Sequence, residues 1–204
     1  MGGSRFSGSI GKAWQKKVAL FDESKIRYGL RATLAGAFLT LTTAVGGIAA
    51  DNSMQMNHDL GKFVFSFLFA WGLVFVLFLN TELATSNMMY LTAGVYYKAI
   101  NLSKAVKILL FCTLFNLVGA LFIGWLCSFS APFLNLSDTS YLVTVVGAKL
   151  SKGSSQIIIE GILANIFVNI AILGFLFIKS SSARVSVIII AVFMFVYLGY
   201  DHVI

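Results

Sequence analysis

The chain has 204 residues, of which 58% are hydrophobic and 11% are charged, and its formal net charge is +7. Together with a mean hydropathy of +0.88, this composition indicates a protein that crosses a lipid bilayer several times. The basic residues lie between apolar runs and form no patch interleaved with aromatic residues, so nucleic acid is not expected as a partner.

Residues 1–27 are expected to form a cytoplasmic N-terminal segment. Between residues 10 and 21, apolar side chains recur at helical spacing with Lys12, Lys16 and Lys17 between them. This pattern favours an amphipathic helix that lies on the inner surface of the membrane. A disordered basic tail is the alternative, because the stretch is short and follows glycine and serine residues.

Residues 28–204 are expected to form a transmembrane domain with five crossings. The uncharged runs that predict them cover residues 32–50, 63–97, 108–131, 161–178 and 185–200, with Glu82 as the single charge in the second run. The second run is too long for one straight helix, because a crossing needs about 20 residues. We therefore predict a helix that is broken around Glu82, where protein or a water-filled path surrounds the irregular backbone.

The distribution of basic residues predicts the orientation of the chain. Twelve lysine and arginine residues fall on the side of the amino terminus, and three fall on the other side: Lys62, Lys149 and Lys152. The positive-inside rule then places the amino terminus in the cytoplasm. We expect a multi-pass protein of the cell membrane, that is, the inner or plasma membrane.

Two interruptions in apolar runs look like partners. Glu82 and Asp201 each follow a small or polar residue at the point where an aromatic-rich run ends. Paired interruptions in two halves of a chain indicate an inverted repeat with a site near the bilayer midplane; chance similarity between two aromatic helices is the alternative. We place a first repeat at residues 28–127 and an incomplete second repeat at residues 156–204.

A small-residue stripe is expected on the third crossing. Asn116, Ala120 and Gly124 repeat at four-residue spacing, a pattern that lets helices approach closely. We assign these residues to packing.

Four strings carry a resemblance to a known family. They cover residues 80–89 (NTELATSNMM), 115–120 (FNLVGA), 161–165 (GILAN) and 199–202 (GYDH). Each string alone is a weak signal, whereas four in the same order are a strong one. The sequence resembles the formate/nitrite transporter family of anion channels, whose members carry formate, nitrite, hydrosulfide or lactate.

The resemblance implies an all-α polytopic membrane protein with an aquaporin-like inverted repeat of broken helices. Five of the six transmembrane helices of the family are expected in this chain, and the remainder of the second repeat is expected to be missing from it. The implied assembly is a homopentamer with one pore in each protomer. The implied partners are a small monovalent anion and a proton in a lipid bilayer, with no cofactor and no metal.

The resemblance also implies roles for individual residues. His202 resembles the central pore histidine, Lys149 the lysine of the outer vestibule, Thr85 the threonine of the broken second helix, and Asn165 a pore asparagine of the fourth helix. Two apolar constrictions are implied as well, an outer one of Phe69, Leu73 and Phe195 and an inner slit of Leu83, Ala84 and Val168. Some relatives carry phenylalanine at the position of Ala84, which implies a wider slit here.

These residue types suggest a protonation-linked path. An anion loses several kcal/mol of hydration on entering an apolar ring, so the neutral acid passes more easily. Histidine changes its charge near physiological pH, so His202 is the candidate proton relay; a histidine at the membrane surface is the alternative. Glu82 and Asp201 are expected to be structural acids at the helix breaks, where the Glu82 carboxylate would accept backbone N–H bonds. Proton carriage by Glu82 is the alternative. Glu160 is expected to pair with Lys152 or a neighbouring subunit.

Other function classes are less consistent with the sequence. Ser86 and His202 could in principle pair as nucleophile and base, but the chain contains neither a G-x-S-x-G elbow nor an H-E-x-x-H motif, so an enzyme is not expected. Formate is the expected anion. Nitrite or hydrosulfide, or a non-conducting fragment, remain as alternatives.

Overall fold

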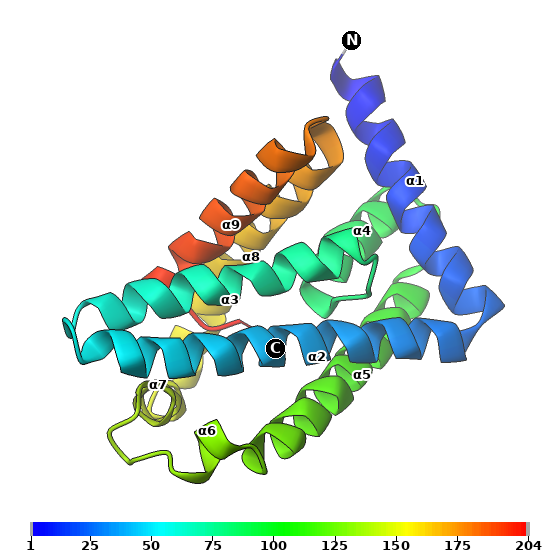
Figure 1. Ribbon diagram of the computed structural model, residues 1–204. Helices are drawn as coiled ribbons and strands as arrows, with labels where there is room; N and C mark the ends of the chain where they lie inside the picture. Colours follow the sequence, from blue (N-terminus) through cyan, green and yellow to red (C-terminus); the bar gives the residue numbers. More distant parts are fainter. Residues whose placement is uncertain (1, 203–204) are drawn as a thin grey trace.

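The computed structural model describes residues 2–202, with side chains from Gly8 onward, and every regular element within that range is a helix (Figure 1). The helices are α1 (Gly2–Glu23), α2 (Lys25–Met54), α3 (Leu60–Phe78), α4 (Ala84–Tyr96), α5 (Leu102–Ser128), α6 (Ala131–Leu134), α7 (Tyr141–Leu150), α8 (Ser154–Phe177) and α9 (Ser181–Leu198). The expected N-terminal segment and second repeat extend to Met1 and to residues 203–204, which lie outside the described residues.

Five of the described helices, α2, α3, α5, α8 and α9, are long and apolar enough to cross a membrane. The all-α membrane fold is therefore confirmed. The second crossing is interrupted as expected, because α3 ends at Phe78 and α4 begins at Ala84. Within the break, Asn80 adopts a left-handed backbone with φ of 56°, a conformation that asparagine tolerates better than most residues.

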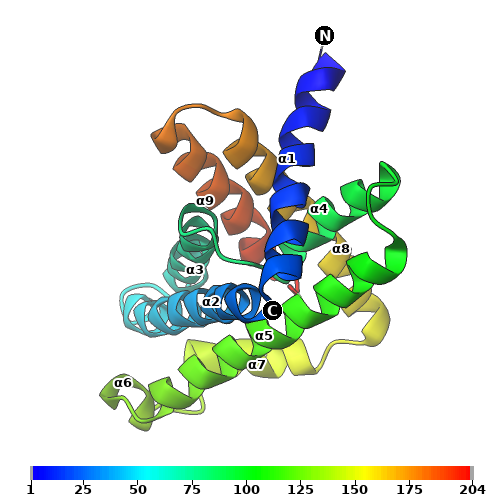
Figure 2. The same cartoon turned by 90° about the vertical axis from the view of Figure 1, so that its right-hand side faces the viewer.

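Helix α2 lies between α3 and α5 (Figures 1 and 2). Its close approach to α5 depends on two glycines: a Cβ atom on Gly36 would lie 1.9 Å from the carbonyl oxygen of Asn116, and one on Gly119 would lie 1.9 Å from that of Thr33. The packing stripe of α5 therefore contains Asn116 and Gly119. The predicted place of Gly124 in it is wrong, because Gly124 is exposed and has nothing within 4 Å of its Cβ position.

Gly119 and Gly124, both on α5, make a matched pair for a stability test. Gly119→Ala is expected to lower the free energy of unfolding by about 2 kcal/mol, because the new methyl group forces α5 away from α2. Gly124→Ala is expected to leave stability unchanged or slightly higher, since alanine favours the helix. Thermal unfolding in detergent micelles measures both, and equal melting temperatures for the two variants would contradict this description of the α2–α5 contact.

Helix α1 packs its apolar side onto the bundle, while its N-terminal end projects away from it (Figures 1 and 2). Val18, Leu20 and Phe21 are buried in a cluster that includes Tyr28 and Ile108. The rings of Phe21 and Tyr28 meet edge to face with centroids 5.3 Å apart. The amphipathic pattern thus forms a helix, in place of the disordered alternative, and part of its apolar face contacts protein.

Candidate functional site

One side chain from α5 holds the backbone of the first break. The Oδ1 atom of Asn116 accepts a hydrogen bond from the backbone nitrogen of Ala84 at 2.9 Å. Its Nδ2 atom donates to the carbonyl oxygens of Glu82 at 2.8 Å and Ala32 at 2.7 Å. Asn116 is fully buried, so these bonds replace helical ones where no water competes. The sequence analysis assigned Asn116 to packing and missed this role, although a polar residue inside an apolar crossing is itself a signal of function.

The carboxylate of Glu82 is held by the side chains of two other residues. The carboxylate is 2% exposed and accepts from Lys17 Nζ at 2.7 Å and Asn87 Nδ2 at 3.1 Å. We expected this carboxylate to accept backbone N–H bonds; the structure instead gives that backbone role to Asn116 and to the carbonyl oxygen of Arg31, which accepts from the Glu82 nitrogen at 3.2 Å. Glu82 thus ties α1 to the break through Lys17.

The neighbouring lysines of α1 allow this ion pair to be tested. Lys17→Ala is expected to lower the free energy of unfolding by about 3 kcal/mol, because it leaves the buried Glu82 carboxylate without its cation. Lys16→Ala is the control, since Lys16 is exposed and forms no ion pair within the described residues. Chemical denaturation or thermal melting compares the two variants. If the Lys17→Ala protein were as stable as the Lys16→Ala protein, the Lys17–Glu82 ion pair would not contribute to stability as described here.

The second break follows α9 and is held by Lys152. Gly199 adopts φ of 81°, a left-handed conformation that favours glycine, and its carbonyl oxygen accepts from Lys152 Nζ at 2.8 Å. Lys152 also pairs with Glu160, as one of the two sequence-based alternatives predicted, and lies 3.1 Å from Asp201 Oδ2. Burial disfavours the charge, but the hydrogen bonds to Glu160 and Asp201 outweigh it and raise the pKa of Lys152. Lys152 therefore stays cationic at neutral pH.

Lys149 is an ion-pair partner of Asp201. Its side chain lies at the end of α7, an apolar helix that the sequence analysis did not anticipate, and is 42% exposed. Lys149 thus lies on the surface with part of its charge balanced by Asp201, and its place in an outer vestibule stays a prediction. This pairing weakens, without removing, the attraction of Lys149 for anions.

The structure brings five of the six constriction residues together. Leu73, Leu83, Val168 and Phe195 belong to one buried cluster, against which Phe69 packs. The four buried members are only 1–3% exposed, so they are part of a tightly packed apolar core, and the two constrictions themselves stay a prediction. Ala84 lies instead in the cluster behind the break that contains Tyr28 and Ile108, and the structure does not group it with Leu83 and Val168.

His202 lies against Phe195 of this cluster. Its imidazole stacks on Phe195 with centroids 5.7 Å apart and planes inclined by 20°. It is half-buried, and its role in the pore stays a prediction.

Three buried polar oxygens belong to residues that neighbour Leu83, Ala164 and Val168 of the apolar cluster in sequence. Thr85 Oγ1, Asn165 Oδ1 and Asn169 Oδ1 have no hydrogen-bond partner among the described residues. The Asn165 amide nitrogen has only a weak acceptor, Met88 Sδ at 3.7 Å. Asn169 was missed from sequence, although it lies one turn after Asn165 on α8. Because unpaired buried polar atoms are costly, these three oxygens are candidates to contact a passing polar ligand.

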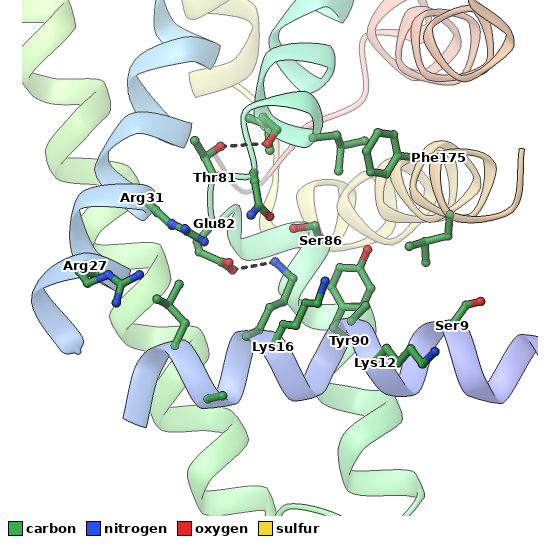
Figure 3. A pocket seen from close by; sticks show the side chains of 18 of the residues that line it. Ser9, Lys12, Lys16, Arg27, Arg31, Thr81, Glu82, Ser86, Tyr90 and Phe175 are labelled. Atoms are coloured by element: carbon green, nitrogen blue, oxygen red, sulfur yellow. Dashed lines mark hydrogen bonds and ion pairs between the residues drawn. The ribbon is translucent and has the colours of Figure 1, made fainter. Parts of the chain in front are cut away.

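A basic cavity leads from α1 toward the first break (Figure 3). Its volume is about 520 Å³, and its lining includes Thr81, Glu82 and Ser86 of the break and the following helix. Five of the lining residues are basic and two are acidic: Lys12, Lys16, Lys17, Arg27 and Arg31 against Glu23 and Glu82. A cavity with this balance raises the local concentration of anions.

Comparison with known proteins gives the family. The formate/nitrite transporter family model matches residues 7–204. An uncharacterised transporter of Bacillus subtilis is 26% identical over 92% of this chain and 73% of its own length. A formate-nitrite transporter of Plasmodium malariae is 27% identical over 85% of this chain and 60% of its own length.

A solved structure agrees in fold. It is described as an FNT family ion channel and superposes with a TM-score of 0.87 at 24% identity, covering 96% of this chain and 78% of the other. A family of transporters is not one of enzymes, in agreement with the sequence-based expectation. The match along almost the whole sequence, on a fold with a broken helix and a buried apolar cluster, shows that the chain belongs to the formate/nitrite transporter family.

Proposed function

We propose that the chain forms a transmembrane path for small monovalent anions, formate first among them, and that passage is linked to protonation at His202. One observation carries the proposal: Thr85, Asn165 and Asn169, whose side-chain oxygens have no partner among the described residues, are neighbours in sequence of Leu83, Ala164 and Val168, which share a buried apolar cluster with Phe195, the residue stacked on His202. The name of the Plasmodium malariae relative supports formate and nitrite as the substrate class.

The mechanism follows from the cost of dehydration. A bare anion entering the ring of Phe69, Leu73 and Phe195 gives up water without gaining a donor, at a cost of several kcal/mol. A proton from the imidazolium of His202 to the carboxylate oxygen of formate leaves a neutral imidazole and converts the anion into the neutral acid, which crosses the apolar ring at much lower cost. The imidazole then takes a proton back from water, which restores the starting state.

The orientation and assembly belong to the same proposal. The charge distribution supports a cytoplasmic amino terminus, which places the basic cavity and Lys17 on the inner side and Lys149 on the outer side. The outward face of α5 exposes Leu110, Leu114 and Leu121, a surface suited to lipid or to neighbouring protomers. We propose a homopentamer with one path per protomer, in a cell membrane.

Uptake into liposomes identifies the preferred anion and distinguishes a conducting chain from a non-conducting fragment. We expect proteoliposomes containing the chain to take up labelled formate faster than protein-free liposomes, with nitrite and hydrosulfide as parallel substrates. The Asn116→Ala protein, whose break should be disrupted, is the matched negative control. Faster uptake of nitrite or hydrosulfide than of formate would change the assigned anion, and no uptake of any of the three would overturn the proposal in favour of a non-conducting fragment.

A further inference from the structure

Two pairs of basic side chains face the cavity under α1 from different helices. Lys12 and Lys16 lie one turn apart on α1, and Arg27 and Arg31 lie one turn apart on α2 (Figure 3). Residues four apart lie on the same face of a helix. The cavity therefore has a lysine pair on one wall and an arginine pair on another.

Among the described residues, no carboxylate forms an ion pair with these four cations. The fifth lining cation, Lys17, is paired with Glu82, and the other lysine pair near α1 joins Lys104 to Asp22. Within the described chain, none of Lys12, Lys16, Arg27 and Arg31 forms an ion pair. Glu23 is then the remaining acid in the lining, so the cavity retains a clear excess of positive charge.

The arrangement suits an anion with several oxygens and more than one negative charge. A guanidinium group binds phosphate oxygens through two parallel hydrogen bonds, and a lysine adds a compact charge. A carboxylate as small as formate has two oxygens and engages one such fork at a time. A volume of about 520 Å³ also lies in the ordinary range of small-molecule sites, roughly 300 to 1,000 Å³.

We propose that this cavity binds a phosphoryl group carried by a soluble phosphate compound or by an anionic lipid headgroup, with Arg27 and Arg31 gripping its oxygens and Lys12 and Lys16 completing the charge. The bound group links α1 to α2 at the entrance to the first break. This inference concerns binding alone and goes beyond the proposed anion path, so it stands or falls independently of whether the chain conducts.

The first arm of the test uses inorganic pyrophosphate and the detergent-solubilised chain. Isothermal titration calorimetry is expected to show saturable binding. Binding should be weakened at least about tenfold in the double variants Lys12→Gln/Lys16→Gln and Arg27→Gln/Arg31→Gln, because each variant removes two charged groups that contact the phosphoryl oxygens. The control is Lys98→Gln/Lys107→Gln, which removes two exposed lysines outside the cavity and should bind as the unmodified chain does.

The second arm tests the lipid source in nanodiscs without soluble phosphate. If the ligand is a headgroup, phosphatidylglycerol will raise the melting temperature relative to phosphatidylcholine in the unmodified chain and the control, and will raise it less in both cavity variants. Should the glutamine variants fail to fold, Arg27→Lys/Arg31→Lys keeps the charge, removes the forks and is expected to weaken binding several-fold. The site is supported if the proteins with an intact cavity bind pyrophosphate, or are stabilised by phosphatidylglycerol, more strongly than the cavity variants. The site is ruled out if the cavity variants behave like the control variant in both arms.

Discussion

Asn116→Ala is expected to lower the free energy of unfolding by about 3 kcal/mol and to abolish anion flux. The substitution removes the acceptor of the Ala84 nitrogen and the amide donor to Glu82 and Ala32. Buried backbone groups without partners cost about 1–3 kcal/mol each, and in a membrane no water replaces the lost bonds. Thermal unfolding in micelles gives the stability, and proteoliposome uptake gives the flux.

Thr113→Ala is the matched control for this prediction. Thr113 lies one turn before Asn116 on α5, and among the described residues its hydroxyl donates only to the carbonyl oxygen of Leu109 in its own helix, at 2.9 Å. Its replacement should change stability by less than about 1 kcal/mol and leave flux intact. If Asn116→Ala were to unfold and conduct like Thr113→Ala, the break would have to be held by contacts other than the Asn116 amide.

His202→Asn is expected to remove the pH dependence of formate uptake. In the unmodified chain, uptake should rise as the outside is acidified through the range where an imidazole changes charge. Asparagine keeps a polar side chain beside Phe195 but cannot exchange a proton, so uptake at mildly acidic pH should fall at least about tenfold. Initial rates in proteoliposomes across a series of external pH values measure the effect.

The other histidine of the chain supplies the control. His58 is exposed on the loop between α2 and α3 and contacts Asp59 at 3.9 Å. His58→Asn should keep both the rate and the pH profile of the unmodified chain. A His202→Asn protein that folds normally and retains that same pH profile would exclude His202 as the proton relay.

The broken second crossing could be predicted because its signal is local. A run of apolar residues longer than one crossing, with Glu82 in a polar string, requires an interruption whatever the rest of the chain does. The side chain that holds the break could not be predicted in the same way. Asn116 is 32 residues from Ala84 and 84 from Ala32, and only the close α2–α5 contact at Gly36 and Gly119 brings them together.

The same distinction applies to the charged residues. Lys152 and Glu160 are eight residues apart, so their pairing was predictable, whereas Lys17 and Glu82 are 65 residues apart and meet only because α1 folds back over the break. The residues implied for the two constrictions lie in or against one apolar cluster, except Ala84, and the constrictions themselves stay a prediction. Ala84 lies at the first turn of α4, where neighbouring side chains point to different faces, so Leu83 faces one cluster and Ala84 the other.

The central claim is tested most directly by measuring proton entry and formate entry in the same proteoliposomes. Proteoliposomes holding a pH-sensitive dye and no initial pH gradient would receive an inward formate gradient. Passage of formate with a proton predicts internal acidification in step with formate entry, unaffected by valinomycin and potassium, and lost in His202→Asn. Formate entry without acidification, accelerated by a valinomycin-driven inside-positive potential, would mean that the bare anion crosses the apolar ring and would contradict the account.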